Sequence, residues 1–292
     1  MGVILDLLTQ KKVLISDGAW GTMLQAKGMT PQDCPEEWNI SHAEAVQSVA
    51  TAYQDAGSDL ILTNTFGGSS IKLAKMGYEQ RVAEFNLAGA KNSLIGAPQA
   101  IIAGSVGPTG EFLQPLGTAT SEEMTAVFTQ QFTALLEAGV HAVCVETMTA
   151  IDEAICAVQA ARTLDADIDI ISTFTFDPTP NGYRTMMGVS PQQVAEELPK
   201  AGANIIGANC GNGIQQMIEI TGELREHTDL PILIHANAGL PELVDGQTVF
   251  RQSPEAMAAL TQPLVDAGAN IIGGCCGTTP AHIAAMKAAI DN

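Results

Sequence analysis

Short apolar runs alternate with longer amphipathic stretches along the whole chain. Four of these runs follow an Ala-Gly pair at a fixed offset, and the pairs are Ala56-Gly57, Ala138-Gly139, Ala201-Gly202 and Ala267-Gly268. Each glycine is expected to end a helix, and the apolar run after it to form a buried strand. One helix–strand unit therefore recurs along the sequence.

A further apolar run lies between consecutive copies of this unit, and one more precedes the first copy. The eight expected strands lie at residues 13–17, 60–62, 101–104, 142–145, 168–172, 205–206, 231–235 and 271–272. Amphipathic stretches predict helices at 121–137, 191–200, 214–228 and 254–266. Two of these helices begin with a serine followed by a proline, Ser190-Pro191 and Ser253-Pro254, which is a typical capping pattern.

Strict alternation of strands and helices indicates a parallel sheet. Eight such units in 292 residues predict a closed (β/α)8 barrel, an α/β TIM barrel that occupies residues 1–292 as a single domain. A doubly wound open sheet is the alternative. The Gly-x-Gly-x-x-Gly fingerprint of dinucleotide-binding sheets is missing, and the glycines from Gly207 to Gly213 have the wrong spacing for it.

Composition narrows the classes of partner. Hydrophobic residues make up 46% of the chain and aromatic residues 4%, so the core must be mainly aliphatic, as in parallel sheets covered on both faces. Thirteen basic against 32 acidic residues give a formal net charge of −19, which argues against nucleic acids and anionic membranes. Six cysteines are few for a secreted disulfide scaffold, and the first residues lack the features of a signal peptide. A cytoplasmic location is therefore expected.

Three cysteines fall at equivalent places in two copies of the unit. The stretch 201–211 recurs almost unchanged at 267–277, which aligns Cys210 with Cys276 and puts Cys275 directly before it. Because a barrel carries its chemistry at the carboxyl ends of its strands, these thiols are expected to share one rim. One interpretation is a catalytic zinc site with three protein ligands and one exchangeable position. The plainer one is a pair of small buried residues.

Other polar residues stand at expected strand ends or near them. Asp17 ends the first strand, and Glu146 ends the fourth, at a place that corresponds to Asn209-Cys210 in the repeat. Cys144 lies inside a strand and is expected in the core, while His141 opens that strand and need not be a ligand. His282 lies in the first turn of a helix and is expected to face solvent.

Six motifs together resemble the homocysteine S-methyltransferase family, zinc-dependent (β/α)8 barrels that methylate homocysteine to methionine. They are DGAWGT at 17–22, TNTF at 63–66, GSVGP at 104–108, VET at 145–147, GANC at 207–210 and GGCCGTTP at 273–280. The resemblance covers essentially the whole chain. It implies that Cys210, Cys275 and Cys276 hold Zn²⁺.

The same resemblance assigns substrate residues. Asp17 and Glu146 match acids that hold the amino group of homocysteine, and the backbone around Thr65 and Phe66 would receive its carboxylate. Asn237 matches a residue proposed as a displaceable fourth zinc ligand in the cobalamin-dependent members. For Asp17, the alternative is that it only caps a turn.

The methyl donor is expected to be a methyl-corrinoid (cobalamin) carried by a separate protein. The first motif and the Cys-Cys motif are closer to the cobalamin-dependent branch, and the eight barrel units account for the chain length. The segment 107–120 would form a docking surface for this carrier or a lid. S-methylmethionine and betaine are alternative donors, and another small thiol is an alternative acceptor. Outside the enzymes, the alternative is a zinc- or thiol-binding module without methyl transfer.

Overall fold

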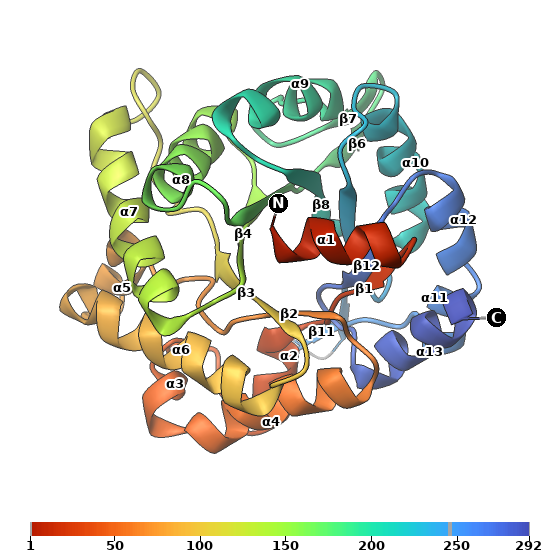
Figure 1. Ribbon diagram of the computed structural model, residues 1–292, viewed down its shortest axis with the longest axis horizontal. Helices are drawn as coiled ribbons and strands as arrows, with labels where there is room; N and C mark the ends of the chain where they lie inside the picture. The colour runs from red at the N-terminus through yellow and green to blue at the C-terminus, as the bar shows by residue number, and fades with distance from the viewer. Residues whose placement is uncertain (1, 245–246, 292) are drawn as a thin grey trace.

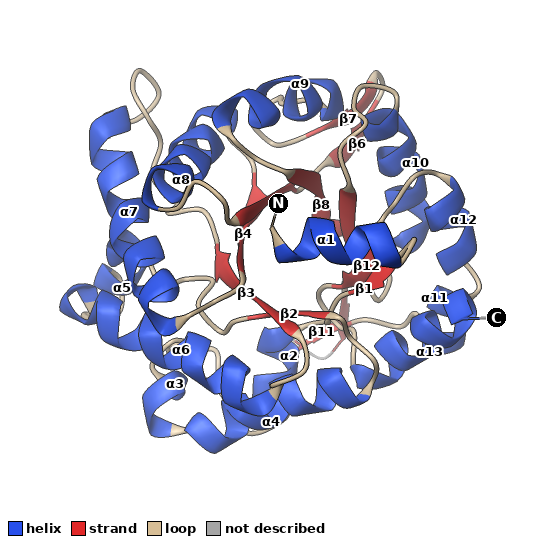
Figure 2. Cartoon of the chain, in the orientation of Figure 1, coloured by secondary structure: helices blue, strands red, loops and turns tan. Residues whose placement is uncertain are grey.

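Eight parallel strands surround a central axis, and helices surround the strands (Figures 1 and 2). The computed structural model describes residues 2–244 and 247–291. The barrel strands are β1 Leu14–Ile15, β2 Leu60–Leu62, β3 Ile101–Val106, β4 Ala142–Met148, β5 Asp169–Phe174, β8 Ile205–Gly213, β9 Ile232–Asn237 and β12 Ile271–Gly274. A bridge between Ser16 and Leu60 joins the first strand to the second and closes the sheet. The predicted (β/α)8 barrel is confirmed, and the doubly wound alternative is wrong. The extent of the domain, residues 1–292, stays a prediction.

The connections between the strands supply the helices and two short hairpins. The helices are α1 Val3–Gln10, α2 Trp20–Gln25, α3 Trp38–Ser41, α4 Ala43–Asp55, α5 Ser70–Ala74, the 3₁₀ helix η1 Glu79–Arg81, α6 Val82–Gly96, α7 Ser121–Ala138, α8 Ile151–Leu164, α9 Pro191–Ala201, α10 Ile214–Arg225, α11 Pro254–Ala258, α12 Thr261–Asp266 and α13 Pro280–Asp291. The hairpins are β6 Asp177–Thr179 with β7 Gly182–Arg184, and β10 Glu242–Val244 with β11 Gln247–Val249. Among the described residues, no helix combines the length and the apolar character that crossing a membrane requires.

Two helix predictions need correction. The stretch 254–266 forms two helices, α11 and α12, because Pro263 has no backbone N–H to donate to Ala259 and its ring crowds that carbonyl. The helix predicted to run to residue 228 ends at Arg225. There His227 donates to the carbonyl of Leu224, so the last turn tightens and the helix stops.

The recurring Ala-Gly unit has one structural cause in all four copies. Each glycine has the left-handed backbone expected at a helix end, with φ of 96°, 91°, 115° and 117° in chain order. Two residues later, a side chain accepts a hydrogen bond from the backbone N–H of the preceding strand. The pairs are Asp59 with Ile15, His141 with Ile102, Asn204 with Ile170 and Asn270 with Ile232, at 2.9–3.1 Å. The unit therefore ties each even-numbered strand to the odd-numbered one before it, and His141 has this structural role.

Alternate strand residues point into the barrel. Near the amino ends of the strands these residues are apolar, including Cys144 and Leu233, and they pack against the fully buried Ile4 of α1. The prediction that Cys144 is a core residue is confirmed. Two positions further along the same faces, Glu146 follows Cys144 and His235 follows Leu233. The interior therefore changes from apolar to polar toward the carboxyl ends of the strands.

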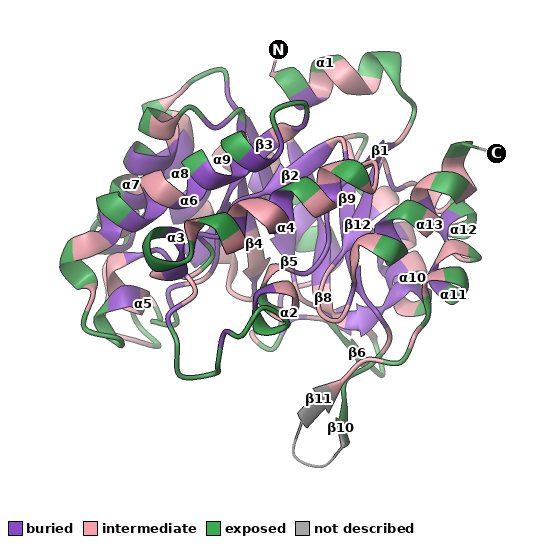
Figure 3. Ribbon diagram, turned by 90° about the horizontal axis from the view of Figure 1, so that it is seen from below, coloured by how far each residue is buried: buried purple, intermediate pink, exposed green. Residues whose placement is uncertain are grey.

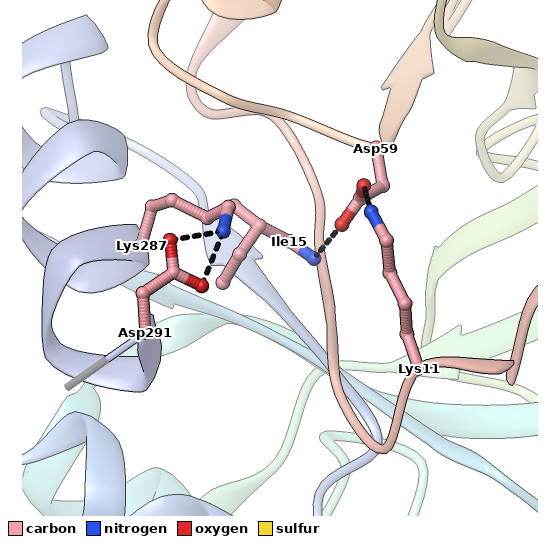
Figure 4. Close-up of polar contacts among 5 residues, drawn as sticks. All are labelled: Lys11, Ile15, Asp59, Lys287 and Asp291. Carbon is pink, nitrogen blue, oxygen red and sulfur yellow. Dashed lines mark hydrogen bonds and ion pairs between the residues drawn. The ribbon is translucent and has the colours of Figure 1, made fainter.

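Helix α1 covers the amino-terminal end of the barrel, at the opposite end from strand β10 (Figures 1 and 3). After the helix, Lys11 forms an ion pair with Asp59, which also accepts the bond from Ile15 (Figure 4). The same close-up shows a second pair, Lys287 with Asp291, on α13. Asp59 therefore joins the segment after α1 to the first two strands.

Asp169, at the start of β5, anchors α1 from inside the barrel. Its Oδ2 accepts hydrogen bonds from the backbone of Ile4 at 2.7 Å and of Leu5 at 3.3 Å, which satisfies two free donors of the first helical turn. Because capping bonds of this kind contribute about 1–2 kcal/mol, Asp169→Ala should lower the free energy of unfolding by that amount. Urea denaturation measures it. The exposed Asp167→Ala is the control and should change stability little; equal losses in both variants would contradict the anchoring role.

Candidate active site

A cavity of about 690 Å³ opens at the carboxyl ends of the strands. Its inner wall contains three cysteines together with Ser105, Glu146 and His235. Its outer wall comes from the loops that follow the first two strands, including Trp20, Glu36, Phe66, Lys72 and Met76. The cavity therefore extends from the polar layer inside the barrel outward to the loops.

The sulfur atoms of Cys210, Cys275 and Cys276 all lie within 4.8 Å of one another. The Sγ atoms of Cys210 and Cys276 are 3.9 Å apart. Tetrahedral zinc with Zn–S bonds of ~2.3 Å requires a separation of about 3.8 Å between sulfurs. Three soft thiolate donors at this spacing fit zinc in place of magnesium or calcium. The structure therefore brings together the three residues that the repeat predicted to meet.

A backbone irregularity aims Cys210 at this cluster. The pairing of β8 with β9 shifts between Asn209 and Gly213, and Cys210 has a positive φ of 61°. The same φ occurs at Thr147, the corresponding position of the repeat in β4, where the register also shifts. A non-glycine residue in this conformation is strained, and such strain is typical of functional sites.

The loop that carries Cys275 and Cys276 is held by backbone hydrogen bonds to two neighbouring strand ends. Gly274 N–H donates to the carbonyl of Asp17 at 2.8 Å, and Cys275 N–H donates to Ala236 at 2.7 Å. The carbonyl of Cys276 accepts from Ala238 at 3.0 Å. The two thiols are therefore fixed against the first and seventh strands of the barrel before any ligand binds.

The three thiols share their protons. Hydrogen bonds from Cys275 and Cys276 lower the pKa of Cys210 to about 3, and the same hydrogen bonds to the Cys210 sulfur raise the pKa of the other two thiols. The three thiols therefore favour one thiolate, on Cys210, beside two protonated neighbours. A metal ion that binds all three sulfurs must displace those two protons.

Asn209 connects the cysteine strand to Glu146. Its Oδ1 accepts from the backbone N–H of Thr147 and from the hydroxyl of Thr173, both at 2.8 Å. Its Nδ2 donates to the Thr147 hydroxyl at 2.7 Å and lies 3.4 Å from a carboxylate oxygen of Glu146. The sequence placed Asn209 at the rim without a role, and the structure shows that it orients two strand ends.

Asp17 and Glu146 form an acidic pair, of which Asp17 is buried and Glu146 partly buried. Glu146 lines the cavity and accepts a 2.5 Å hydrogen bond from Ser105. Asp17 is fully buried behind the lining, where Oδ2 accepts from the backbone of Leu62 and the indole of Trp20, both at 2.8 Å. These bonds extend well beyond the simple turn cap of the alternative interpretation.

Burial makes the charged forms of both acids unfavourable. Desolvation raises the pKa of Glu146 to about 7, and the negative charge of Asp17 adds to this shift. Desolvation likewise raises the pKa of Asp17 to about 6, although its hydrogen bonds oppose the shift. A cation placed beside them would favour ionisation of both carboxylates. The floor of the cavity is therefore suited to a positively charged group.

The remaining predicted residues lie around this floor. Phe66 lines the cavity and is partly exposed, whereas Thr65 is fully buried, with its hydroxyl bound to the carbonyl of Ser105 at 2.7 Å. Within the described residues, the backbone N–H groups of Thr65 and Phe66 donate no hydrogen bond, and Phe66 lines the cavity. Asn237 is buried, and its amide lies close enough to the Cys210 thiolate to stabilise it.

Two histidines differ from the sequence analysis. His282 is buried, against the prediction that it faces solvent. Its Nδ1 accepts from Thr279 and its Nε2 contacts the carbonyl of Gln252 at 2.9 Å, so the ring ties α13 to the loop after β11. His235 lines the cavity, although the sequence analysis assigned it no role. Burial lowers the pKa of its ring to about 4, so the imidazole is neutral.

A (β/α)8 barrel with a three-thiol cluster and two neighbouring acids at the carboxyl ends of its strands has the architecture of an enzyme barrel, whose chemistry lies at that end. The sequence model of the homocysteine S-methyltransferase family matches residues 14–290. The chain belongs to this family.

Known relatives agree with this assignment. The chain is 29% identical to the methionine synthase of Mycobacterium tuberculosis and 28% identical to that of Mycobacterium leprae, over 99% and 98% of its length. It spans only 25% of the length of either relative. The homocysteine methyltransferase MmuM from Escherichia coli, in its metallated form, has the same fold with a TM-score of 0.78 and 24% identity, over 97% of this chain and 98% of MmuM.

Proposed function

We propose that the protein methylates the thiol of homocysteine to form methionine, with Zn²⁺ held by Cys210, Cys275 and Cys276. The observation that carries this proposal is the position of three converging sulfurs in one cavity with Glu146, in front of the buried Asp17. A bound zinc ion would keep the substrate sulfur ionised at neutral pH, when a free thiol with a pKa of about 8.5 is mostly protonated. Membership of the family supports the choice of substrate.

The residues of the chain have separate tasks in this proposal. Asp17 and Glu146 receive the α-ammonium group, and the free N–H groups of Thr65 and Phe66 receive the carboxylate. Together they hold the amino acid in one orientation, with its sulfur toward the cysteines, and positioning of this kind supplies a large part of the rate enhancement in group transfer. Asn237 would act as a displaceable fourth ligand, because a half-turn of its amide would bring the unpaired Oδ1 to the thiol cluster.

For the donor, we propose a methyl-corrinoid on a separate carrier protein. Similarity to the two methionine synthases supports a donor of this kind. The outer part of the cavity leaves room beyond the cysteines, and the segment 107–120 exposes Phe112 and Leu116 to a partner. S-methylmethionine is the second candidate, because Glu36 and Lys72 in the outer wall could hold the charged groups of a small amino-acid donor.

A parallel assay of donors tests this proposal. Zinc-loaded protein and homocysteine are incubated with a methylated corrinoid protein, methylcobalamin, S-methylmethionine or betaine, and methionine is measured. We expect turnover with the corrinoid donors and at least ~100-fold slower turnover with the other two. Rapid turnover with S-methylmethionine and none with a corrinoid would replace the carrier hypothesis with the second candidate. No turnover with any donor, together with tight zinc binding, would favour a binding module.

A further inference from the structure

His235 and Asn237 carry buried polar atoms for which the described residues offer no hydrogen-bond partner. These atoms are Nε2 of His235 and Oδ1 of Asn237, and both side chains are 3% exposed. A polar atom buried without a partner is costly, so such an atom on a residue that lines a ligand cavity, as His235 does, points to a missing ligand group. Both residues lie on β9, two positions apart, and therefore on the same inward face of the strand.

The two residues lie at different depths in the barrel. Asn237 is level with the thiol cluster, because its amide interacts with Cys210. His235 is one step deeper and pairs in register with Asn209 on one side and Gly273 on the other. Two positions along a strand correspond to ~6.5 Å. The sulfur and amino nitrogen of homocysteine are separated by three carbon atoms, about 5 Å with ordinary bond lengths, so a sulfur at the cysteines places the amino group near the depth of His235.

The neighbouring residues leave space for the imidazole and set the charge around it. A Cβ at position 273 would lie 2.8 Å from Cδ2 of His235, so the glycine gives the ring its place. On the other side, Asn209 connects this layer to the carboxylate of Glu146. A carboxylate of the substrate would be repelled at this depth by Glu146, whereas an ammonium group would be attracted.

We infer that His235 is a further substrate-binding residue, whose Nε2 accepts a hydrogen bond from the α-ammonium group of homocysteine. This inference rests on the proposed function, since it takes homocysteine as the ligand. A neutral imidazole supplies one acceptor nitrogen, and an ammonium group has three N–H donors to distribute. The two acids and His235 would then account for all three donors. Thiols without an α-amino group would lose this contact.

Two thiol ligands, one with and one without an amino group, distinguish a substrate-binding role of His235 from a structural role. Calorimetric titration of the zinc-loaded protein compares homocysteine with 4-mercaptobutyrate, which has the same chain and carboxylate but lacks the amino group. His235→Leu should weaken homocysteine binding about tenfold and change 4-mercaptobutyrate binding less than ~2-fold. His235→Gln, which keeps an acceptor, should retain part of the affinity for homocysteine. The role is wrong if His235→Leu loses both thiols alike or neither, or if His235→Gln binds as weakly as His235→Leu.

A measurement on the unaltered protein does not depend on how the variants fold. With ¹⁵N-labelled histidine, the ring signal of His235 should move when homocysteine is added and stay in place with 4-mercaptobutyrate. A signal that ignores homocysteine while calorimetry shows binding would overturn the role of His235 and leave the proposed function intact. If the unaltered protein does not bind homocysteine at all, both proposals fall.

Discussion

Cys276→Ser is expected to abolish tight zinc binding and to reduce methyl transfer to homocysteine by at least ~100-fold. The serine hydroxyl is a poor ligand for zinc at neutral pH, because it stays protonated. The two remaining thiolates would then be too few to hold the ion tightly. Metal analysis after dialysis should fall from about one zinc per chain to a small fraction.

Cys156→Ser is the matched control for this experiment. Cys156 is also buried, but it lies on α8 and does not line the cavity. This variant should keep its zinc and its activity. Full zinc occupancy and full activity in Cys276→Ser would rule out the proposed ligand set.

Glu146→Gln and Asp17→Asn are expected to keep zinc but to bind homocysteine at least about tenfold more weakly. Each substitution removes a charge-assisted hydrogen bond to the ammonium group, a contribution of ~1.5–3 kcal/mol. Calorimetric titration with homocysteine measures the loss, and metal analysis checks that zinc remains. Glu153→Gln is the control, because Glu153 is a buried acid that contacts Thr109 and does not line the cavity. Unchanged homocysteine affinity in both test variants would assign the two acids another role.

The pH dependence of the same titrations follows from the raised pKa of Glu146. Because that pKa is about 7, the free protein loses carboxylate charge as the pH falls from 8 to 6, and the bound ammonium favours the ionised form. Homocysteine affinity should therefore decrease over this range, with proton release on binding. Glu146→Gln should lose the part of this dependence that Glu146 contributes.

The stability of the ligand-free protein should increase as the pH falls, whereas the affinity for homocysteine decreases. An acid whose pKa rises from 4.5 in the unfolded chain to about 7 in the fold contributes stability below pH 4.5, and this contribution is lost as the pH rises to 7. Near pH 8, Glu146→Gln removes this carboxylate charge. The variant should therefore have a higher midpoint of thermal unfolding, although it binds homocysteine more weakly. The ionised carboxylate thus lowers the stability of the fold and at the same time favours the binding of a cation.

The fold could be predicted because the Ala-Gly unit fixes it locally. The glycine conformation and the acceptor two residues later belong to each copy, so the sequence shows them directly. The break in 254–266 could have been found from Pro263. The burial of His282 could not, because it depends on Gln252, which only the return of the loop after β9 brings to the ring.

The site could be predicted to the extent that the repeat aligns its parts. Cys210 and Cys276 come together because their copies are equivalent, and Glu146 occupies, in an earlier copy, the place of Asn209 and Cys275. His235 was expected at the strand-end rim but was assigned no role, although it stands two positions after the buried Leu233 and thus on the inner face of its strand. Side chains alternate between the inner and outer faces along each strand, and this rule applied to the seventh strand would have placed His235 inside the barrel.

Helix α1 closes one end of the barrel, and this determines the order in which acceptor and donor can bind in the proposed reaction. With Ile4 packed into the interior at the amino-terminal end, the cavity is reached from its outer mouth. In the proposed arrangement the amino acid occupies the bottom of the cavity and the methyl donor the space above it. The acceptor must therefore enter first, and methionine can leave only after the demethylated donor has withdrawn. In this arrangement binding and release are ordered, and the last molecule to bind is the first to dissociate.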